Sequence, residues 1–358
     1  MRTRDKNILV GGAIGFGFIA IVDILLQWFK HNEENKPFTW ESYNGMQTLK
    51  KGFFGFVIGA GTGYLTYKYK VSEESKLPFS SDEYLRKLLT SESLKSKPSI
   101  FQKVLLRRER VKQLLTDRFH KKLVAPPEDS GSFHKRTAIA SNYDLDIIVP
   151  FKKTSFNNLE NMFEDVHEVI DNSFGHEATV TKQTKAISIA FDEETEPVYF
   201  DIVPGREINN YKNDKLLNLY VRPEWIWQRG SSFKTNVQSQ QKLTKNKPQA
   251  RTVIKLLKCY RDKNGFELSG PILEQCVIET LSNRNYGVHP STTENLLNCM
   301  EYLSKKITQK TVIDYSNTNN NLNEKFPASD REAFADQLIT DIKRIENNPR
   351  YIREIFEA

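Results

Sequence analysis

The sequence predicts a mixed α/β core followed by a helical lobe, with a two-helix membrane segment in front of both. Short runs of β-type residues occur between residues 145 and 203 and predict the strands of one sheet. Apolar residues then recur at helical spacing almost continuously after residue 251. Two apolar, glycine-rich runs lie within the first 70 residues. The chain of 358 residues is long enough for one large catalytic domain with a short appendage.

The predicted membrane segment is a transmembrane hairpin over residues 1–70. Residues 8–29 form a 22-residue apolar run whose only charge is Asp23, which is long enough to cross a bilayer. Residues 52–67 form a second, shorter run without charge, which ends in tyrosines followed by lysines. Both runs carry glycines four residues apart, so two helices could pack closely. The alternatives are a buried soluble helix pair and a secretory signal, for which no cleavage site is evident.

The rest of the chain divides into three parts. A polar juxtamembrane linker and helix occupies residues 71–99, the α/β core residues 100–250 and the helical lobe residues 251–358. An amphipathic helix with a basic outer face is predicted at 101–119. Strands are predicted at 145–151, 186–191 and 198–203. Helices are predicted at 251–262, 271–282, 292–307 and 329–345.

The charge balance and the cysteines limit the possible partners. There are 52 Lys and Arg residues against 45 Asp and Glu, a formal charge of +7, which mildly favours phosphate-bearing partners or an anionic membrane face. The three cysteines, Cys259, Cys276 and Cys299, stand in no metal-binding or disulfide spacing. We expect them to be buried thiols in a reducing compartment.

Three acidic residues have the arrangement of a metal site. Asp144 and Asp146 come just before an apolar run, and residues two apart on a strand project from the same face. Asp201 is a lone acid inside the apolar run 198–203, where a charge is costly unless it is paired or coordinated. Carboxylate oxygens are the ligands that Mg²⁺ and Mn²⁺ prefer. The three acids would complete a site for two ions that act in phosphoryl transfer.

A Gly-Ser pair stands upstream of these acids. Gly131 and Ser132 predict a short turn whose backbone N–H groups and hydroxyl could hold phosphate oxygens. The dipeptide means little alone, and an Asp-x-Asp pair is often only a surface turn. The ordered set of Gly-Ser, the acid pair before an apolar strand and a later strand acid is much more specific.

From about residue 80 to 345 the chain resembles the cGAS/DncV-like nucleotidyltransferases, relatives of oligoadenylate synthetase within the polymerase β superfamily. The segments that carry the resemblance are GSFHKRTAI at 131–139, DLDIIV at 144–149, YFDIVP at 199–204, ARTVIKLLKCYRDKNGFEL at 250–268 and VIDYSNTNNN at 312–321. The family commonly has Pro where Tyr315 stands, in a loop that we expect to take no part in catalysis.

The resemblance implies a polymerase β-type nucleotidyltransferase core with an oligoadenylate synthetase-like lobe. It implies catalysis and metal binding by Asp144, Asp146 and Asp201, with two Mg²⁺ or Mn²⁺ ions as cofactors. The implied reaction joins ATP or other nucleoside triphosphates into a cyclic di- or oligonucleotide second messenger and releases pyrophosphate. The implied setting is anti-phage signalling, with a downstream effector or regulatory protein as a further partner.

A basic stripe follows on the helix from residue 251. Arg251, Lys255 and Lys258 share one face at helical spacing, and the alternative is a simply exposed helix face. By similarity to the family, Lys258 would hold the triphosphate, with Lys255 beside it. Ser269 is a weaker candidate for the same phosphates.

Two other functions remain open at this stage. A terminal nucleotidyltransferase or linear oligonucleotide synthase would act on a nucleic-acid or protein hydroxyl; nucleic acid is a partner only in this reading, and the modest charge argues against it. A membrane protein with a degenerate nucleotide-binding domain is disfavoured by the intact acids. Because nucleoside triphosphates are available in the cytosol, we expect a multi-pass protein of the inner or plasma membrane whose catalytic domain is cytoplasmic.

Overall fold

The computed structural model describes residues 79–143, 145–192, 197–223, 225, 229–315, 317–324 and 326–357. The predicted hairpin at residues 1–70 and Asp144 lie outside these ranges. None of the helices within them has the length and the apolar character needed to cross a membrane. The chain forms two compact units, one of which is Ser81–Asn348. In the described part of the other, α13 (Tyr351–Phe356) carries Arg353, whose guanidinium lies over the Phe79 ring.

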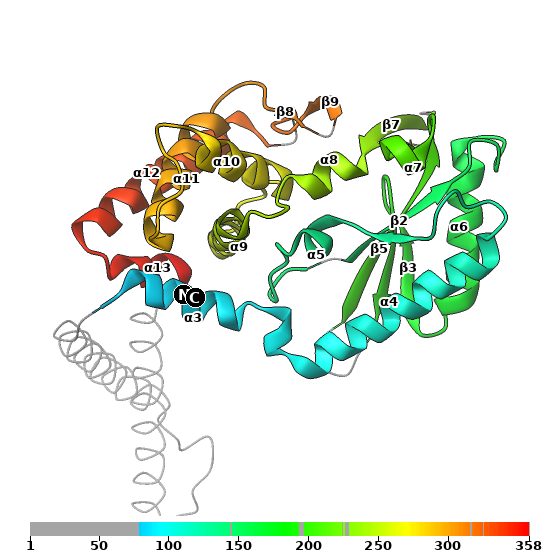
Figure 1. Ribbon diagram of the computed structural model, residues 1–358, viewed down its shortest axis with the longest axis horizontal. Helices are drawn as coiled ribbons and strands as arrows, with labels where there is room; N and C mark the ends of the chain where they lie inside the picture. The colour runs from blue at the N-terminus through cyan, green and yellow to red at the C-terminus, as the bar shows by residue number, and fades with distance from the viewer. Residues whose placement is uncertain are drawn as a thin grey trace, which may run out of the picture. The chain divides into compact units, whose positions relative to one another are not determined.

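A mixed seven-stranded sheet forms the centre of the larger unit (Figure 1). The central pair, β2 (Leu145–Phe151) and β5 (Val198–Glu207), is parallel, and all other pairs are antiparallel. The remaining strands are β1 (Glu128–Asp129), β3 (Ala178–Lys182), β4 (Ile187–Phe191), β6 (Leu216–Val221) and β7 (Ser231–Asn236). The three predicted strands are confirmed as β2, β4 and β5. Of the other four, β1, β3 and β7 are short or rich in polar residues, whereas β6 is mostly apolar and was missed by the prediction.

Alternation along the strands gives the sheet one apolar face and one face that carries the acids. Leu145, Ile147 and Phe200 are buried in the main core. They pack with α4 (Pro98–Phe119) and with α6 (Leu159–Phe174), a helix that the sequence analysis did not predict. Asp146 and Ile148 alternate with them and therefore point to the opposite face, where Ile148 joins a second, smaller cluster. The core thus fixes which face of β2 carries its acid.

Four long helices of the described residues form the bundle of the C-terminal lobe, and all four were predicted from the sequence. They are α9 (Pro248–Lys263), α10 (Gly270–Ser282), α11 (Thr292–Ile307) and α12 (Ala328–Asn347). Their apolar stripes pack together, and the buried Tyr260 hydroxyl donates a hydrogen bond to Asp341 across the bundle, at 2.8 Å. Cys276 and Cys299 are buried free thiols of this bundle, as expected, whereas Cys259 is partly exposed.

Short elements lie between the larger helices and strands of both the core and the lobe. The helices α3 (Ser81–Ser91), η1 (Leu94–Ser96), α5 (Gly131–Lys135), α7 (Tyr211–Asp214) and α8 (Val237–Lys242) lie in the connections, and β8 (Ile313–Asp314) pairs with β9 (Asn317–Asn321). The boundaries predicted from the sequence for most elements agree within a few residues with those in the structure. Proline begins both α4 and α9, at residues 98 and 248, because its fixed φ and missing N–H suit the first helical turn.

Candidate active site

Asp146 and Asp201 stand side by side on the two parallel central strands. The register of β2 and β5 places these two residues directly opposite one another. Partners in register project from the same face of a sheet, so both carboxylates point away from the main core. Both residues are partly exposed, and the Gln183 side chain donates a hydrogen bond to Asp201 Oδ1 at 3.3 Å. The predicted convergence of these two acids is therefore present in the fold.

The acid pair has the donor chemistry of a divalent cation site. Asp144, the third predicted ligand, lies outside the described residues. Within the ranges that the structure describes, no group of three His, Cys, Asp or Glu side chains is arranged to hold a metal ion. Two hard oxygen donors in register nevertheless fit Mg²⁺ or Mn²⁺, which take few protein ligands together with substrate phosphates.

Gly131 touches the carboxylate of Asp146. The Ser130 N–H donates to the Asp146 carbonyl oxygen at 2.8 Å, which holds the Gly-Ser segment against β2. Gly131 has a φ of +59°, and a Cβ atom there would lie 1.5 Å from Asp146 Oδ2. Only glycine fits this position without displacing the carboxylate. The spacing between the Gly-Ser pair and the acid pair is therefore explained by direct contact.

The Gly-Ser pair begins a helix, and the predicted short turn is wrong in this respect. Gly131 and Ser132 form the first turn of α5, which ends at Arg136 in the left-handed conformation. The Thr137 N–H donates to the Ser132 carbonyl at 2.9 Å and closes this short helix. The five-residue helix is too short to produce a periodic apolar pattern, so the sequence could not reveal it.

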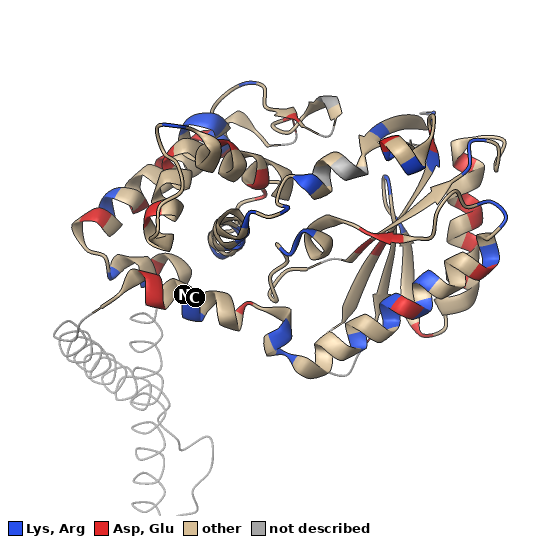
Figure 2. Cartoon of the chain, viewed as in Figure 1, with Lys and Arg blue, Asp and Glu red and all other residues tan. Residues whose placement is uncertain are grey.

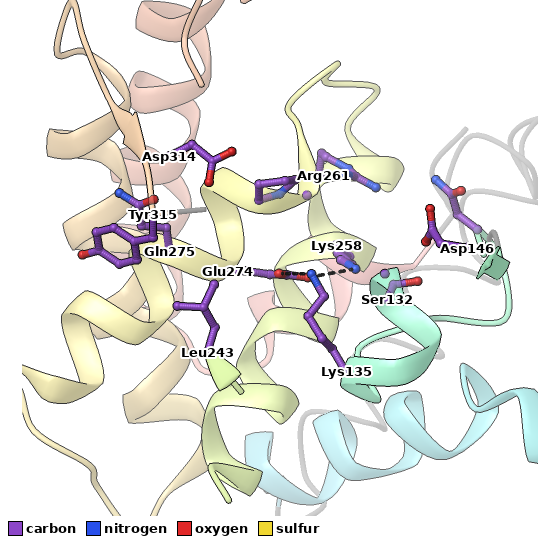
Figure 3. A pocket seen from close by; sticks show the side chains of 14 residues that line it. Ser132, Lys135, Asp146, Leu243, Lys258, Arg261, Glu274, Gln275, Asp314 and Tyr315 are labelled. Atoms are coloured by element: carbon purple, nitrogen blue, oxygen red, sulfur yellow. Dashed lines mark hydrogen bonds and ion pairs between the residues drawn. The ribbon is translucent and has the colours of Figure 1, made fainter. Parts of the chain in front are cut away.

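The Gly-Ser pair and Asp146 line a cavity of about 330 Å³ together with residues of the lobe (Figure 3). Lys258 of α9, the predicted triphosphate ligand, also lines this cavity. Asp201 is beside Asp146 in the sheet, but it does not line the cavity. The fold thus gathers residues from 131 to 315 around one space.

A buried group of charges connects the core to the lobe at this cavity. Glu274 of α10 accepts a hydrogen bond from Lys135 Nζ at 2.5 Å, and its other oxygen lies 3.8 Å from Lys258 Nζ. Figure 3 shows Glu274 joined to both lysines. The Thr137 hydroxyl also donates to Glu274, and Lys258 Nζ donates to the Thr137 carbonyl. A buried carboxylate is stable only with such partners, so this group fixes the position of Lys258.

The environment of Lys258 differs from that of an ordinary surface lysine. Its side chain is only 9% exposed. Burial lowers the pKa of Lys258, and the nearby Glu274 carboxylate opposes this effect. A buried lysine with one fixed carbonyl contact is a point charge of defined position, which suits a phosphate group that enters the cavity.

The other predicted phosphate ligands lie apart from this cavity. Lys255 of α9 is partly buried and does not line the cavity. Burial lowers the pKa of Lys255, as it does that of Lys258. Arg251 instead donates to the Thr244 carbonyl at 2.9 Å. Ser269 is the exposed N-cap residue of α10, next to Gly270, which does border the cavity. The basic stripe therefore contributes one residue to the site.

The loop after α11 also borders the cavity. Asp314 and Tyr315 line it, and the Tyr315 hydroxyl donates to Glu279 at 2.6 Å. We expected this loop to take no part in catalysis, and the structure places it at the rim of the candidate site. Lys135 and Glu274 were not predicted. They are 139 residues apart, and no local pattern links them.

Comparisons with known proteins identify the fold. No family model matches the sequence, and no curated protein matches it. Solved structures do match. The nucleotidyltransferase CdnC of Escherichia coli MS115-1, solved with ATP, has a TM-score of 0.59 at 17% identity, over 78% of this chain and 97% of that one. The same protein in a complex with HORMA-deltaN gives 0.54 at 19% identity, over 75% and 93%.

Two further structures extend the likeness. The CD-NTase CdnG of Bradyrhizobium diazoefficiens, in complex with GTP, has a TM-score of 0.61 at 13% identity, over 77% of this chain and 95% of that one. The cyclic AMP-GMP synthase DncV of Vibrio cholerae, in complex with the linear intermediate 5' pppA(3',5')pG, has a TM-score of 0.55 at 13% identity, over 76% and 93%. The described part of the chain therefore shares the fold of these solved structures, a mixed α/β core with a helical C-terminal part.

Proposed function

We propose that the protein is a metal-dependent nucleotidyltransferase that makes a cyclic di- or oligonucleotide from nucleoside triphosphates. The observation that carries the proposal is the contact between Gly131 and the Asp146 carboxylate, in register with Asp201 and at a cavity that Lys258 shares. This is a phosphate-binding segment placed directly against paired metal ligands. The ATP, GTP and linear intermediate bound by the solved neighbours support the substrate class.

The residues of the site have different roles in the proposed nucleotide transfer: some would bind metal ions and others the phosphates. Asp144, Asp146 and Asp201 would hold two Mg²⁺ or Mn²⁺ ions, which lower the pKa of the attacking hydroxyl and neutralise charge on the leaving pyrophosphate. Ser132 lies beside Asp146 at the cavity, where its hydroxyl can donate to a phosphate oxygen. Lys258 supplies a fixed positive charge to the triphosphate from the opposite, lobe side.

The product and its setting follow from the same proposal. A cyclic oligonucleotide acts as a signal, so a downstream effector or regulatory protein is the expected partner, and defence against phage is the setting that we propose. The complex of CdnC with HORMA-deltaN shows that a protein of this fold can associate with another protein.

The test is product analysis with the full-length protein in detergent. Each labelled ribo- and deoxyribonucleoside triphosphate is incubated with Mg²⁺ or Mn²⁺, and the products are separated before and after phosphatase treatment. We expect a phosphatase-resistant product, because a cyclic oligonucleotide has no terminal phosphate. A ladder of phosphatase-sensitive linear products, or extension of an added oligonucleotide, would favour the terminal transferase instead. No incorporation with any nucleotide would contradict both functions.

Replacement of Lys258 by Ala is expected to raise the KM for the nucleoside triphosphate about tenfold or more, because a fixed charge on the phosphates acts in both the ground and transition states. The matched variant Lys255→Ala removes the same charge from the same helix but outside the cavity. Its KM should remain within about twofold of the wild type. Steady-state kinetics on both variants test this. A larger effect of Lys255→Ala would place the wrong lysine at the phosphates.

We also propose that residues 8–67 anchor the protein in the inner or plasma membrane with the catalytic domain in the cytoplasm. The support is the sequence alone, through the two apolar, glycine-patterned runs. We expect full-length protein to stay in the membrane fraction through high-salt and carbonate washes, because hydrophobic insertion does not depend on ionic strength. A fragment from residue 71 should be soluble. Release of the full-length protein by salt alone would contradict the anchor.

A further inference from the structure

A second cavity lies beside the first and is strongly basic. It has a volume of about 400 Å³ and no Asp or Glu in its lining. Its basic lining residues are His134, Lys135, Arg136, Lys242, Lys245 and Arg251. Figure 2 shows blue, basic segments on α5, α8 and the start of α9. This concentration of one sign of charge is unusual on a chain whose overall balance is only +7.

Most of these charges have no carboxylate partner. Among the described residues, Lys135 is the one basic side chain of this lining that forms an ion pair, with Glu274. Arg136, Lys242 and Lys245 are exposed. Like charges gathered around one space repel each other, and this repulsion is relieved when an anion enters. The arrangement therefore costs free energy in the empty cavity and favours an anionic ligand.

The wall of the cavity is built by hydrogen bonds rather than by a loose loop. Thr244 is almost fully buried, and its hydroxyl donates to the Lys135 carbonyl at 3.4 Å. The Arg251 guanidinium donates to the Thr244 carbonyl, and the Lys245 N–H donates to the Lys242 carbonyl. These bonds tie the segment after α8 to both α5 and α9. The basic side chains are thus carried on a backbone that is fixed before any ligand binds.

We propose that this second cavity binds a small polyphosphate, that is, the phosphate chain of a nucleoside polyphosphate or inorganic triphosphate. Multiple unpaired lysine and arginine donors match the several charged oxygens of such a chain. A cavity of about 400 Å³ is of the size that small-molecule ligands occupy. It is separate from the candidate active site, although Lys135 lines both cavities and α5 forms part of each wall. Binding of a polyphosphate in the second cavity does not depend on whether the protein is an enzyme.

The test is calorimetric titration of the full-length protein in detergent with inorganic triphosphate, in EDTA so that the acidic site holds no divalent ion. The variant Lys242→Gln/Lys245→Gln removes two charges from the second cavity and leaves α5 intact. We expect it to weaken binding about tenfold or more. Lys258→Ala reports on the first cavity, and Lys212→Gln/Lys343→Gln removes two exposed charges elsewhere. The Lys212→Gln/Lys343→Gln variant should leave affinity within about twofold of the wild type, whereas Lys258→Ala should weaken only binding to the first cavity and leave binding to the second.

Parallel titrations with ATP and with a short single-stranded oligonucleotide distinguish the sources of phosphate. Comparable affinities for triphosphate and ATP are expected, since the phosphates make the contacts. Loss of binding in Lys258→Ala would move the phosphate to the first cavity and overturn the proposal. Equal affinity of Lys242→Gln/Lys245→Gln and the wild type would do the same. An oligonucleotide that binds far more tightly than triphosphate would make the region a nucleic-acid surface instead.

Discussion

Asp144→Asn combined with Asp146→Asn is expected to abolish nucleotide transfer, with a loss of about a thousandfold or more, as for charged groups that act in phosphoryl transfer. Asp146 lies in register with Asp201 and against Gly131, so its carboxylate is at the centre of the proposed site. The amide keeps the size of the side chain and removes the negative charge that a divalent cation needs. The rate of product formation at saturating nucleotide measures the loss.

The fold of this variant should be unchanged. Replacing Asp146, which stands opposite Asp201, relieves repulsion between carboxylates, so the melting temperature should equal or exceed that of the wild type. The variant Asp330→Asn/Asp336→Asn serves as the control, because it removes two exposed acids from α12 and should keep full activity. Turnover by the Asp144 and Asp146 variant within tenfold of the wild type would contradict the proposal that these acids are catalytic metal ligands.

Gly131→Ala is expected to lower activity about a hundredfold, the cost of misplacing a catalytic group by about 1 Å. The added methyl would lie 1.5 Å from Asp146 Oδ2, so the carboxylate must move. The atoms nearest to the added methyl are the terminal atoms of the Asp146 side chain, Oδ2 and Cγ. The left-handed φ of +59° adds a loss of about 1 kcal/mol for any residue with a Cβ. Kinetics and thermal unfolding separate the two effects.

Gly265→Ala is the matched control for this prediction. Gly265 also has a left-handed φ, of +69°, but a Cβ there would meet no atom within 4 Å. It should therefore lose about the same stability, roughly 1 kcal/mol, and keep its activity. If both variants lost activity equally, backbone strain would explain the result and contact with Asp146 would not.

Periodic segments of the fold were predictable because their patterns are local. The apolar runs at 145–151 and 198–203 identify β2 and β5, and helical spacing locates the four lobe helices. Both patterns arise because an element with one buried face has apolar residues at regular, short intervals. The strands β1, β3, β6 and β7 depend on pairing with β2, β4 and β5. β6 carries an apolar run that the prediction missed, whereas the residues of β1, β3 and β7 are too polar or too few to predict a strand. The short helix α5 has the same limitation.

The sequence by itself determined which residues carry the chemistry of the proposed site: two acids before an apolar strand, one acid within another, and a glycine where close contact is needed. Alternation along a strand is a local rule, and it fixed the face of Asp146 without any knowledge of the fold. The resemblance already pointed to Lys258, but only the tertiary structure decided that Lys258 lines the cavity and that Lys255 does not. That choice depends on Glu274 and Thr137, which approach from distant segments. Contacts between distant segments arise from packing of the whole chain, so no spacing within one segment can reveal them.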